Sequence, residues 1–478
     1  MNFPMIVHIL GWILNFEALF LIIPLISAVA FGENTVVSIL ITIAVCAAIG
    51  VPIAMKKPQE RSLHSRDGYV IVSLSWIVLS AFGALPFVFS GAIPSYVDAL
   101  FETVSGFTTT GASILTEVES MPKSLLLWRS FTHWVGGMGV LVFIMAFLPL
   151  SGGQNLHIMK AESPGPSVSK LVPKIKTTAL LLYAIYLVLT AMEFVLLLFG
   201  GMSVFEALNT SFATAGTGGF SVKNDGLAGY SDAVRMIVTV FMILFSFNFN
   251  FYFLILSRKF KDALKVSEVW YYLGIIAAAT AIVTVNIRAM FPSSGEAFRA
   301  AIFTISSMIS STGFTAVDFN LWPELSRTII VLVMFIGACA GSTGGGIKVY
   351  RIIILFKSMG KELHMLIHPK QVKKIRMDSH EIEHEVIRSV NVFMVCFILV
   401  FVISLLCISF EDYDLITNFT AVTATINNIG PGLELVGPTA NFSFFSPFSK
   451  MVLIFDMLAG RLELFPMLLL FSPVTWKK

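Results

Sequence analysis

Charged residues are scarce in this chain of 478 residues, because Asp, Glu, Lys and Arg together make up only 13% of it. Soluble globular domains carry about 25%. Hydrophobic residues reach 56%, and the mean hydropathy is +0.84. A chain with so little charge cannot cover its surface for water, so the composition excludes a soluble globule and indicates a polytopic membrane protein.

Cysteine and N-terminal positive charge are also nearly absent. The four cysteines, Cys46, Cys339, Cys396 and Cys407, lie inside apolar runs with no disulfide or metal-ligand spacing, so we interpret them as packing residues. The first 24 residues contain no Lys or Arg. This absence argues against a cleaved signal peptide and favours a retained first span. The net charge of +3 is small and no basic patch interleaved with aromatics occurs, so no nucleic-acid partner is predicted.

Long apolar runs predict ten membrane spans, since a span needs about 20 mainly apolar residues. The runs cover residues 5–30, 36–55, 69–90, 126–148, 178–200, 233–256, 269–290, 327–356, 389–410 and 450–472. The longest polar insert, 357–388, is read as a connector. Alternate loops and the C-terminus hold 23 of the 32 Lys and Arg residues. Because cytoplasmic loops carry such an excess, both termini are expected on the cytoplasmic side.

A short motif recurs in four loops on the opposite side. Each copy starts with apolar helix-forming residues and ends in Thr, Ser or Asn close to glycine. The copies are DALFETVSGFTTTGAS (98–113), FEALNTSFATAGTGGFS (205–221), AIFTISSMISSTGFT (301–315) and ITNFTAVTATINNIGPG (416–432). A single stretch of this kind could be an ordinary loop. Four of them at equivalent places indicate a repeated unit of span, half-helix, glycine turn and span.

The predicted fold is therefore an all-α membrane protein. An initial two-helix hairpin precedes four span–pore-helix–filter–span repeats, which surround one pseudo-fourfold central pore. The expected divisions are residues 1–60 for the hairpin and 61–165, 166–262, 263–375 and 376–478 for the repeats.

Ion dehydration gives the repeated turn a physical purpose. Backbone carbonyls can replace the water that a potassium ion loses on entering a narrow pore. Glycine lets a carbonyl turn toward the pore axis, because it adopts conformations closed to other residues. Irregular backbone at membrane depth is tolerated where it lines a watery cavity. Hydroxyl groups that can brace these turns or lend oxygens belong to Thr108, Thr109, Thr110, Thr217, Ser311 and Thr312.

In SGFTTTGAS, GTGGFS, SSTGFT and NNIGPG, and in the initial hairpin, the chain resembles the TrkH-type branch of the Trk/Ktr/HKT superfamily of potassium transporters. The resemblance covers nearly the whole chain and implies K⁺ uptake across the cytoplasmic (inner) membrane. It assigns the selectivity filter to Thr109, Thr110, Gly111, Thr217, Gly218, Gly219, Thr312, Gly313, Asn428, Ile429 and Gly430. The register of the second loop stays open, since Gly216, Gly218 and Gly219 all occur there. In this superfamily a serine in the first loop accompanies sodium permeation, so Gly111 favours potassium.

The resemblance also implies partners. It implies a homodimer with one pore per subunit, in contact with membrane lipid, and a cytosolic TrkA-like ring that binds the regulatory nucleotide. The basic segment HPKQVKKIR could contact anionic lipid or that ring, and the sequence does not decide between them. No cofactor and no enzyme activity are expected on this chain, and K⁺ is the transported ion.

A glycine-rich segment predicts a gate. FIGACAGSTGGGIKVYRI (335–352) places five glycines between residues 337 and 346 of the eighth span. Each glycine costs a helix interior about 1 kcal/mol, so the helix should break there. The resemblance makes this segment an intramembrane gate loop that uses Gly341, Gly344, Gly345 and Gly346. The alternative is that these small residues allow close helix packing. We interpret GGMG at 136–139 in the same way, as a site of close helix packing.

A single arginine predicts a second gating element. Arg461 lies near the middle of the last predicted span, where an arginine costs about 2.5–3.5 kcal/mol on insertion scales. A fixed positive charge below a cation filter would raise the barrier to passage, and the resemblance supports this role. A structural salt bridge to Asp456 or Glu463 is the alternative.

Three other functions fit parts of the sequence. A sodium- or proton-coupled potassium symporter would use the same pore. HEIEH (380–384) fits the zinc-protease pattern His-Glu-x-x-His, which makes an intramembrane zinc protease a weaker alternative; a solvated helix face or a docking surface explains it more simply. A permease with inverted repeats is disfavoured, because these repeats all run in the same direction.

Overall fold

The computed structural model describes residues 1–56, 58–60, 63–139, 175–369, 371, 374–378 and 380–477, and these are mainly helical. The helices are α1 Phe3–Phe20, α2 Ile22–Phe31, α3 Thr35–Met55, α4 Ser65–Gly83, α5 Leu85–Phe89, α6 Tyr96–Phe107, α7 Lys123–Gly137, α10 Ile175–Phe199, α11 Val204–Ala215, α12 Asp232–Phe245, α13 Phe249–Leu256, α14 Phe260–Ala263, α15 Ser267–Ile287, α16 Ser294–Ile309, α17 Glu324–Ile336, α18 Val349–Ile367, α19 His384–Ile408, α20 Leu415–Ile426, α21 Pro447–Arg461, α22 Phe465–Phe471 and α23 Pro473–Trp476. Short 3₁₀ turns lie at Arg288–Met290, Phe319–Leu321, Ser409–Glu411 and Glu434–Val436.

One feature departs from the all-α prediction. Strands β1 (Arg376–Met377) and β2 (His380–Glu381) pair antiparallel in the connector between α18 and α19. The polar composition of this connector predicted no strand. The HEIEH motif therefore does not lie on one helix, because His380 is on β2 and His384 begins α19. The one-turn helical spacing that the zinc pattern requires is absent.

Long apolar helices account for most of the predicted spans. Within the described ranges, six helical segments are long and apolar enough to cross a membrane, or seven if the bent pair α12–α13 counts as one span. The six are Phe3–Phe31, Thr35–Met55, Ser65–Phe89, Leu180–Phe199, Ser267–Met290 and His384–Glu411. The predicted span 126–148 begins in α7 and continues into residues outside the described part of the chain. The predicted repeat boundaries at 61 and 165–166 also lie outside the described residues.

Three predicted spans are broken. The segment from 337 to 348 separates α17 from α18, as the glycines predicted. The other two breaks lie in the predicted spans 233–256 and 450–472, where no break was predicted. Helices α12 and α13 meet at 88°, and α21 and α22 separate where Glu463 and Leu464 take φ values of 54° and 68°. Non-glycine residues seldom adopt positive φ, so the residue types at Glu463 and Leu464 do not indicate this conformation.

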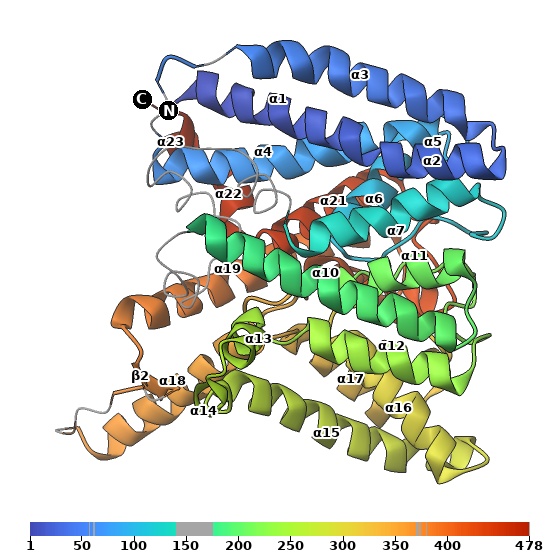
Figure 1. Cartoon of the computed structure of the whole chain (residues 1–478). Helices are drawn as coiled ribbons and strands as arrows, with labels where there is room; N and C mark the ends of the chain where they lie inside the picture. Colours follow the sequence, from blue (N-terminus) through green and yellow to red (C-terminus); the bar gives the residue numbers. More distant parts are fainter. Residues whose placement is uncertain are drawn as a thin grey trace.

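The chain ends lie together. Figure 1 shows the N- and C-termini side by side near α23, with the initial hairpin α1–α3 packed along α4. The rings of Phe3 and Trp476 stack with centroids 6.5 Å apart, and Arg66 Nη1 donates to the Lys477 carbonyl at 2.8 Å. Both termini are therefore at one end of the molecule. Large apolar side chains such as Phe199 and Val285 are exposed on the outer helices, as expected where lipid replaces water.

Candidate functional site

Four short helices stand at the four copies of the repeated motif. Helices α6, α11, α16 and α20 contain 12, 12, 16 and 12 residues. Each follows an N-cap residue whose side chain accepts a hydrogen bond from the backbone N–H three positions on; these residues are Ser95, Ser203, Ser293 and Asp414. Such a cap stabilises a helix by about 1 kcal/mol. The sequence therefore determines where each of these helices begins.

The four helices also end in the same way. The residue after the C-cap has positive φ in every copy, with values of 55° at Thr109, 55° at Thr217, 56° at Ser311 and 54° at Asn428. The next residue donates its N–H to the carbonyl five positions back, in the bonds Thr110–Ser105 (2.9 Å), Gly218–Ala213 (2.8 Å), Thr312–Ser307 (2.9 Å) and Ile429–Ala424 (2.8 Å). This hydrogen-bond pattern is the Schellman motif, which satisfies carbonyls at a helix end.

The residue type at the positive-φ position is unusual. Glycine normally occupies it, whereas here it is Thr, Ser or Asn. A left-handed conformation costs an L-residue roughly 1–2 kcal/mol. Strain of this kind persists where surrounding structure enforces it, and it clusters at functional sites. The sequence predicts unusual backbone at the glycines but not at Thr109 and Thr217, because threonine gives no signal for a left-handed turn.

A glycine with positive φ follows two residues later in each turn. The φ values are 78° at Gly111, 77° at Gly219, 77° at Gly313 and 98° at Gly430. Gly218 is not among the glycines with positive φ. This settles the register that the sequence left open: Gly219 is the equivalent of Gly111, and Thr217 is the equivalent of Thr109.

These glycines approach one another in a closed cyclic order. A Cβ atom added to Gly111 would lie against the carbonyl oxygen of Gly218. A Cβ added to Gly219 would lie against the Thr312 carbonyl oxygen, and one added to Gly313 against the Ile429 carbonyl oxygen. A Cβ added to Gly430 would lie 2.8 Å from the Thr110 carbonyl oxygen. In each case the carbonyl belongs to the residue before the next glycine. The four turns therefore meet around a common centre at a distance that only glycine permits.

Buried hydroxyl groups brace the first and third turns. Thr108 Oγ1 lies 2.8 Å from Thr110 Oγ1, and Ser310 Oγ lies 2.7 Å from Thr312 Oγ1. Asn428 Nδ2 joins the fourth turn to the first by donating to Thr110 Oγ1 at 3.0 Å. All of these side chains are fully buried. Their polar groups therefore hydrogen-bond to one another within the protein and not to bulk solvent.

The segment between α17 and α18 packs directly against these turns. Gly345 N–H donates to Ser311 Oγ, and a Cβ on Gly344 would lie 2.8 Å from the Ser310 carbonyl oxygen. On its other side, Cys339 N–H donates to the Ser246 carbonyl at 3.2 Å, at the break between α12 and α13. The break between α17 and α18 therefore packs against the break between α12 and α13. Left-handed backbone occurs within the segment at Gly341 (φ 66°) and Gly346 (φ 80°).

Arg461 connects this segment to the end of α7. Its Nη1 donates to the Thr343 carbonyl at 2.8 Å, and its Nη2 donates to the carbonyls of Gly136 and Gly137, the latter at 2.9 Å. The two acids suggested as salt-bridge partners contact other residues. Glu463 pairs with Arg351, and Asp456 accepts a hydrogen bond from Ser404 Oγ at 2.6 Å.

A buried carboxylate that the sequence analysis did not single out holds both ends of the same segment. Glu268, near the start of α15, is 3% exposed. Its Oε1 accepts the backbone N–H groups of Ala340 at 2.7 Å and Tyr350 at 3.1 Å, and its Oε2 accepts Asn248 Nδ2 at 3.4 Å. A glutamate in the first turn of a helix is common, so its position in the sequence carried no signal.

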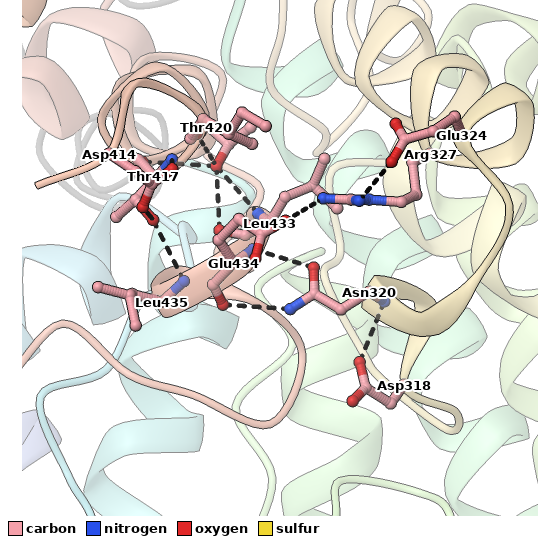
Figure 2. Close-up of polar contacts among 11 residues, drawn as sticks. Asp318, Asn320, Glu324, Arg327, Asp414, Thr417, Thr420, Leu433, Glu434 and Leu435 are labelled. Atoms are coloured by element: carbon pink, nitrogen blue, oxygen red, sulfur yellow. Dashed lines mark hydrogen bonds and ion pairs between the residues drawn. The ribbon is translucent and has the colours of Figure 1, made fainter.

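The segment that follows the fourth turn is held at its outer end. Figure 2 shows Asn320 exchanging two hydrogen bonds with the Glu434 backbone, at 2.9 and 3.1 Å, while Arg327 pairs with the Glu434 and Glu324 carboxylates. Leu433 N–H donates to Thr420 Oγ1 at 2.9 Å. These contacts join the segments that follow the third and fourth copies of the motif.

No zinc centre is apparent among the described residues. There, no three His, Cys, Asp or Glu side chains gather as ligands, and the His380 side chain lies outside that set.

Comparisons with known proteins identify the relatives of this chain. The family model TrkH, described as a cation transport protein, matches residues 34–286 and 271–478. The Trk system potassium uptake protein TrkH of Escherichia coli K12 is 36% identical over 486 residues, and that of Halomonas elongata is 33% identical over 488; in both cases 100% of each chain is covered. The crystal structure of the potassium transporter TrkH from Vibrio parahaemolyticus matches with a TM-score of 0.90 at 32% identity, again over 100% of both chains.

Proposed function

Since the chain belongs to the TrkH family of cation transport proteins, we propose that it takes up potassium ions across the cytoplasmic membrane through the ring of four turns. The observation that carries this proposal is the cyclic approach of Gly111, Gly219, Gly313 and Gly430, each to the carbonyl before the next glycine. A closed ring of main-chain oxygens can replace the hydration shell of an ion without placing a full charge in the pathway.

The half-helices favour a cation at the ring. Each of α6, α11, α16 and α20 ends at a turn, and the C-terminal end of a helix carries a partial charge of about −0.5. Four such ends at one centre attract a cation and repel an anion. In this proposal the selectivity filter consists of the residues that the family resemblance assigns to it: Thr109, Thr110, Gly111, Thr217, Gly218, Gly219, Thr312, Gly313, Asn428, Ile429 and Gly430.

The segment 337–346 is the gate in this proposal. It contacts the third turn through Gly345 and is held by Arg461 and Glu268. Arg461 also places a positive charge next to the pathway, which raises the electrostatic barrier to a cation. The hydrogen bonds from Arg461 to backbone carbonyls fit a second role, in which the side chain acts as a strut: it ties the segment to the end of α7 and keeps it in its closed position.

The assembly belongs to the same proposal. The repeats follow the predicted divisions around one pseudo-fourfold pore, both termini are cytoplasmic, and two chains form a homodimer. A cytosolic TrkA-like ring binds the nucleotide and drives opening. Family membership and the relatives' printed name, a Trk system, support this arrangement.

Ion flux across an alkali-metal series tests the proposal. The purified chain in lipid vesicles is expected to pass K⁺ at least about tenfold better than Na⁺, which corresponds to about 1.4 kcal/mol of preference. Equal fluxes of K⁺ and Na⁺ would overturn the potassium assignment. A channel gives currents that reverse at the potassium equilibrium potential, whereas a reversal potential that shifts with sodium or pH would favour the coupled symporter.

Glu268→Gln is expected to raise the basal K⁺ flux roughly fivefold without changing ion preference. The glutamine amide would face Asn248 Nδ2, since Asn248 Oδ1 is occupied by the Asn250 N–H at 2.9 Å. Two amide donors would then oppose each other, and the loss of charge-assisted bonds weakens the closed segment by about 1 kcal/mol. Flux from vesicles that contain the chain alone measures the effect.

Glu33→Gln is the matched control. The Glu33 carboxylate also accepts backbone N–H groups, from Lys123 at 2.6 Å and Ser124 at 3.1 Å, but it caps α7 rather than the gate segment. A basal flux in Glu268→Gln no higher than in this control would contradict the role of Glu268.

A further inference from the structure

The imidazole of His133 fills the space behind the second turn. His133, on α7, is fully buried. A Cβ added to Gly218 would overlap its ring, where the three nearest atoms are Nδ1, Cγ and Cε1. The backbone of His133 lies equally close to Gly216, since a Cβ there would meet the His133 carbonyl. Neither glycine has positive φ, so contact with His133, and not backbone conformation, requires glycine at these two positions.

The second turn differs from its neighbours in what braces it. The first and third turns carry hydroxyl pairs at the corresponding positions, Thr108 with Thr110 and Ser310 with Thr312. The second turn has Gly216 and Gly218 there, and therefore no side chain at either position. The imidazole supplied by α7 occupies the volume that a side chain at position 218 would take.

His133 is itself held by an aromatic and charged stack. Its ring lies 4.2 Å from that of Phe220, nearly parallel at 17°, and the Arg129 guanidinium also lies over Phe220, at 4.0 Å from the ring centroid. Arg129 forms a buried ion pair with Glu102 at 2.7 Å. Its Nη1 also donates to the Ser221 carbonyl at 3.4 Å. The stack thus connects α6 and α7 to the chain that leaves the second turn.

We propose that His133 is a positioning residue for ion selectivity, which sets the place of the second turn as the hydroxyl pairs set those of the first and third. The proposal rests on the proposed function, because it requires the four turns to be the selectivity filter. It explains why the second motif reads GTGG: Gly219 is needed at the ring, and Gly218 is needed to admit the imidazole. A threonine at position 218 and the imidazole exclude each other.

An exchange of the two side chains tests this. His133→Ala leaves a gap behind the second turn, and we expect the ratio of K⁺ to Na⁺ permeability to fall about fivefold. Gly218→Thr alone forces a side chain into the imidazole and should lower the ratio at least as much. The double variant His133→Ala/Gly218→Thr places threonine where Thr110 and Thr312 stand in their turns, and it should restore the ratio to within about twofold of the unmodified chain. Reversal potentials under paired K⁺ and Na⁺ gradients measure each ratio.

Rescue separates positioning from a general loss of packing. Leu127→Ala also truncates a buried side chain of α7 and is expected to leave the ratio unchanged. If the double variant is as poor as the two single variants combined, the proposal is overturned. If both single variants keep the normal ratio while Gly111→Ser lowers it, this inference fails and the filter stands. If Gly111→Ser has no effect either, the filter itself is wrongly placed.

Discussion

Replacing Gly111 by serine is expected to lower the ratio of K⁺ to Na⁺ permeability by roughly tenfold to a hundredfold. Gly111 has a φ of 78°, and a Cβ there would lie against the Gly218 carbonyl oxygen. A left-handed L-residue costs about 1–2 kcal/mol, and overpacking a tight contact typically adds about 1–3 kcal/mol. The first and second turns must move apart to accept the side chain, so the oxygen ring loses its fit to K⁺ on one side.

Reversal potentials measured with K⁺ on one side and Na⁺ on the other give this ratio directly. Gly91→Ser is the matched control, because Gly91 has a similar φ of 74° but no atom within 4 Å of an added Cβ. It introduces the same backbone strain without touching the ring. An unchanged ratio in Gly111→Ser, with normal insertion of both variants into vesicles, would remove the filter assignment.

The half-helices were predictable because their signals are local. A Ser or Asp cap precedes each half-helix and small polar residues follow it, and both signals act over a few residues. The break at 337–348 was predictable for the same reason, since Gly337, Gly341, Gly344, Gly345 and Gly346 disfavour a helix by themselves.

The break between α12 and α13 was not predictable, because its cause is not local. The α12–α13 break falls at Ser246–Asn248, with neither glycine nor proline. Carbonyls at this break are satisfied by the segment 337–348: the Cys339 N–H donates to Ser246, and Thr343 Oγ1 donates to Phe245 at 3.1 Å. A bend that depends on hydrogen bonds from residues far along the chain leaves no mark in local hydropathy.

The partners of Arg461 were missed for a related reason. An arginine in a predicted span suggests an acidic partner, and Asp456 and Glu463 are near in sequence. The guanidinium donates to the carbonyls of Thr343, Gly136 and Gly137. These carbonyls are available only because the helices end or break there, and backbone acceptors cannot be recognised from residue types.

Deleting residues 341–346 is expected to raise the basal K⁺ flux of the chain alone by about a hundredfold. The contacts that the deletion removes include the Gly345 bond to Ser311, the Thr343 carbonyl that Arg461 binds and the Thr343 hydroxyl bond to Phe245. Three hydrogen bonds contribute about 3 kcal/mol to the closed arrangement, which corresponds to about a hundredfold in the population of open gates. The preference for K⁺ over Na⁺ should persist, because the four ring glycines are untouched.

Substitutions of Arg461 show which property of the gate acts. Arg461→Lys keeps the positive charge but cannot reach three carbonyls with a planar fork, whereas Arg461→Ala removes both charge and strut. If the charge sets the barrier, only the alanine variant leaks; if the strut does, both variants leak. Arg327→Ala, which removes an arginine at the outer cluster of Figure 2, should leave the basal flux unchanged.

The deletion of residues 341–346 decides whether the segment 337–346 is the gate. A basal K⁺ flux equal to that of the unmodified chain, or a leak that no longer prefers K⁺, would show that it is not.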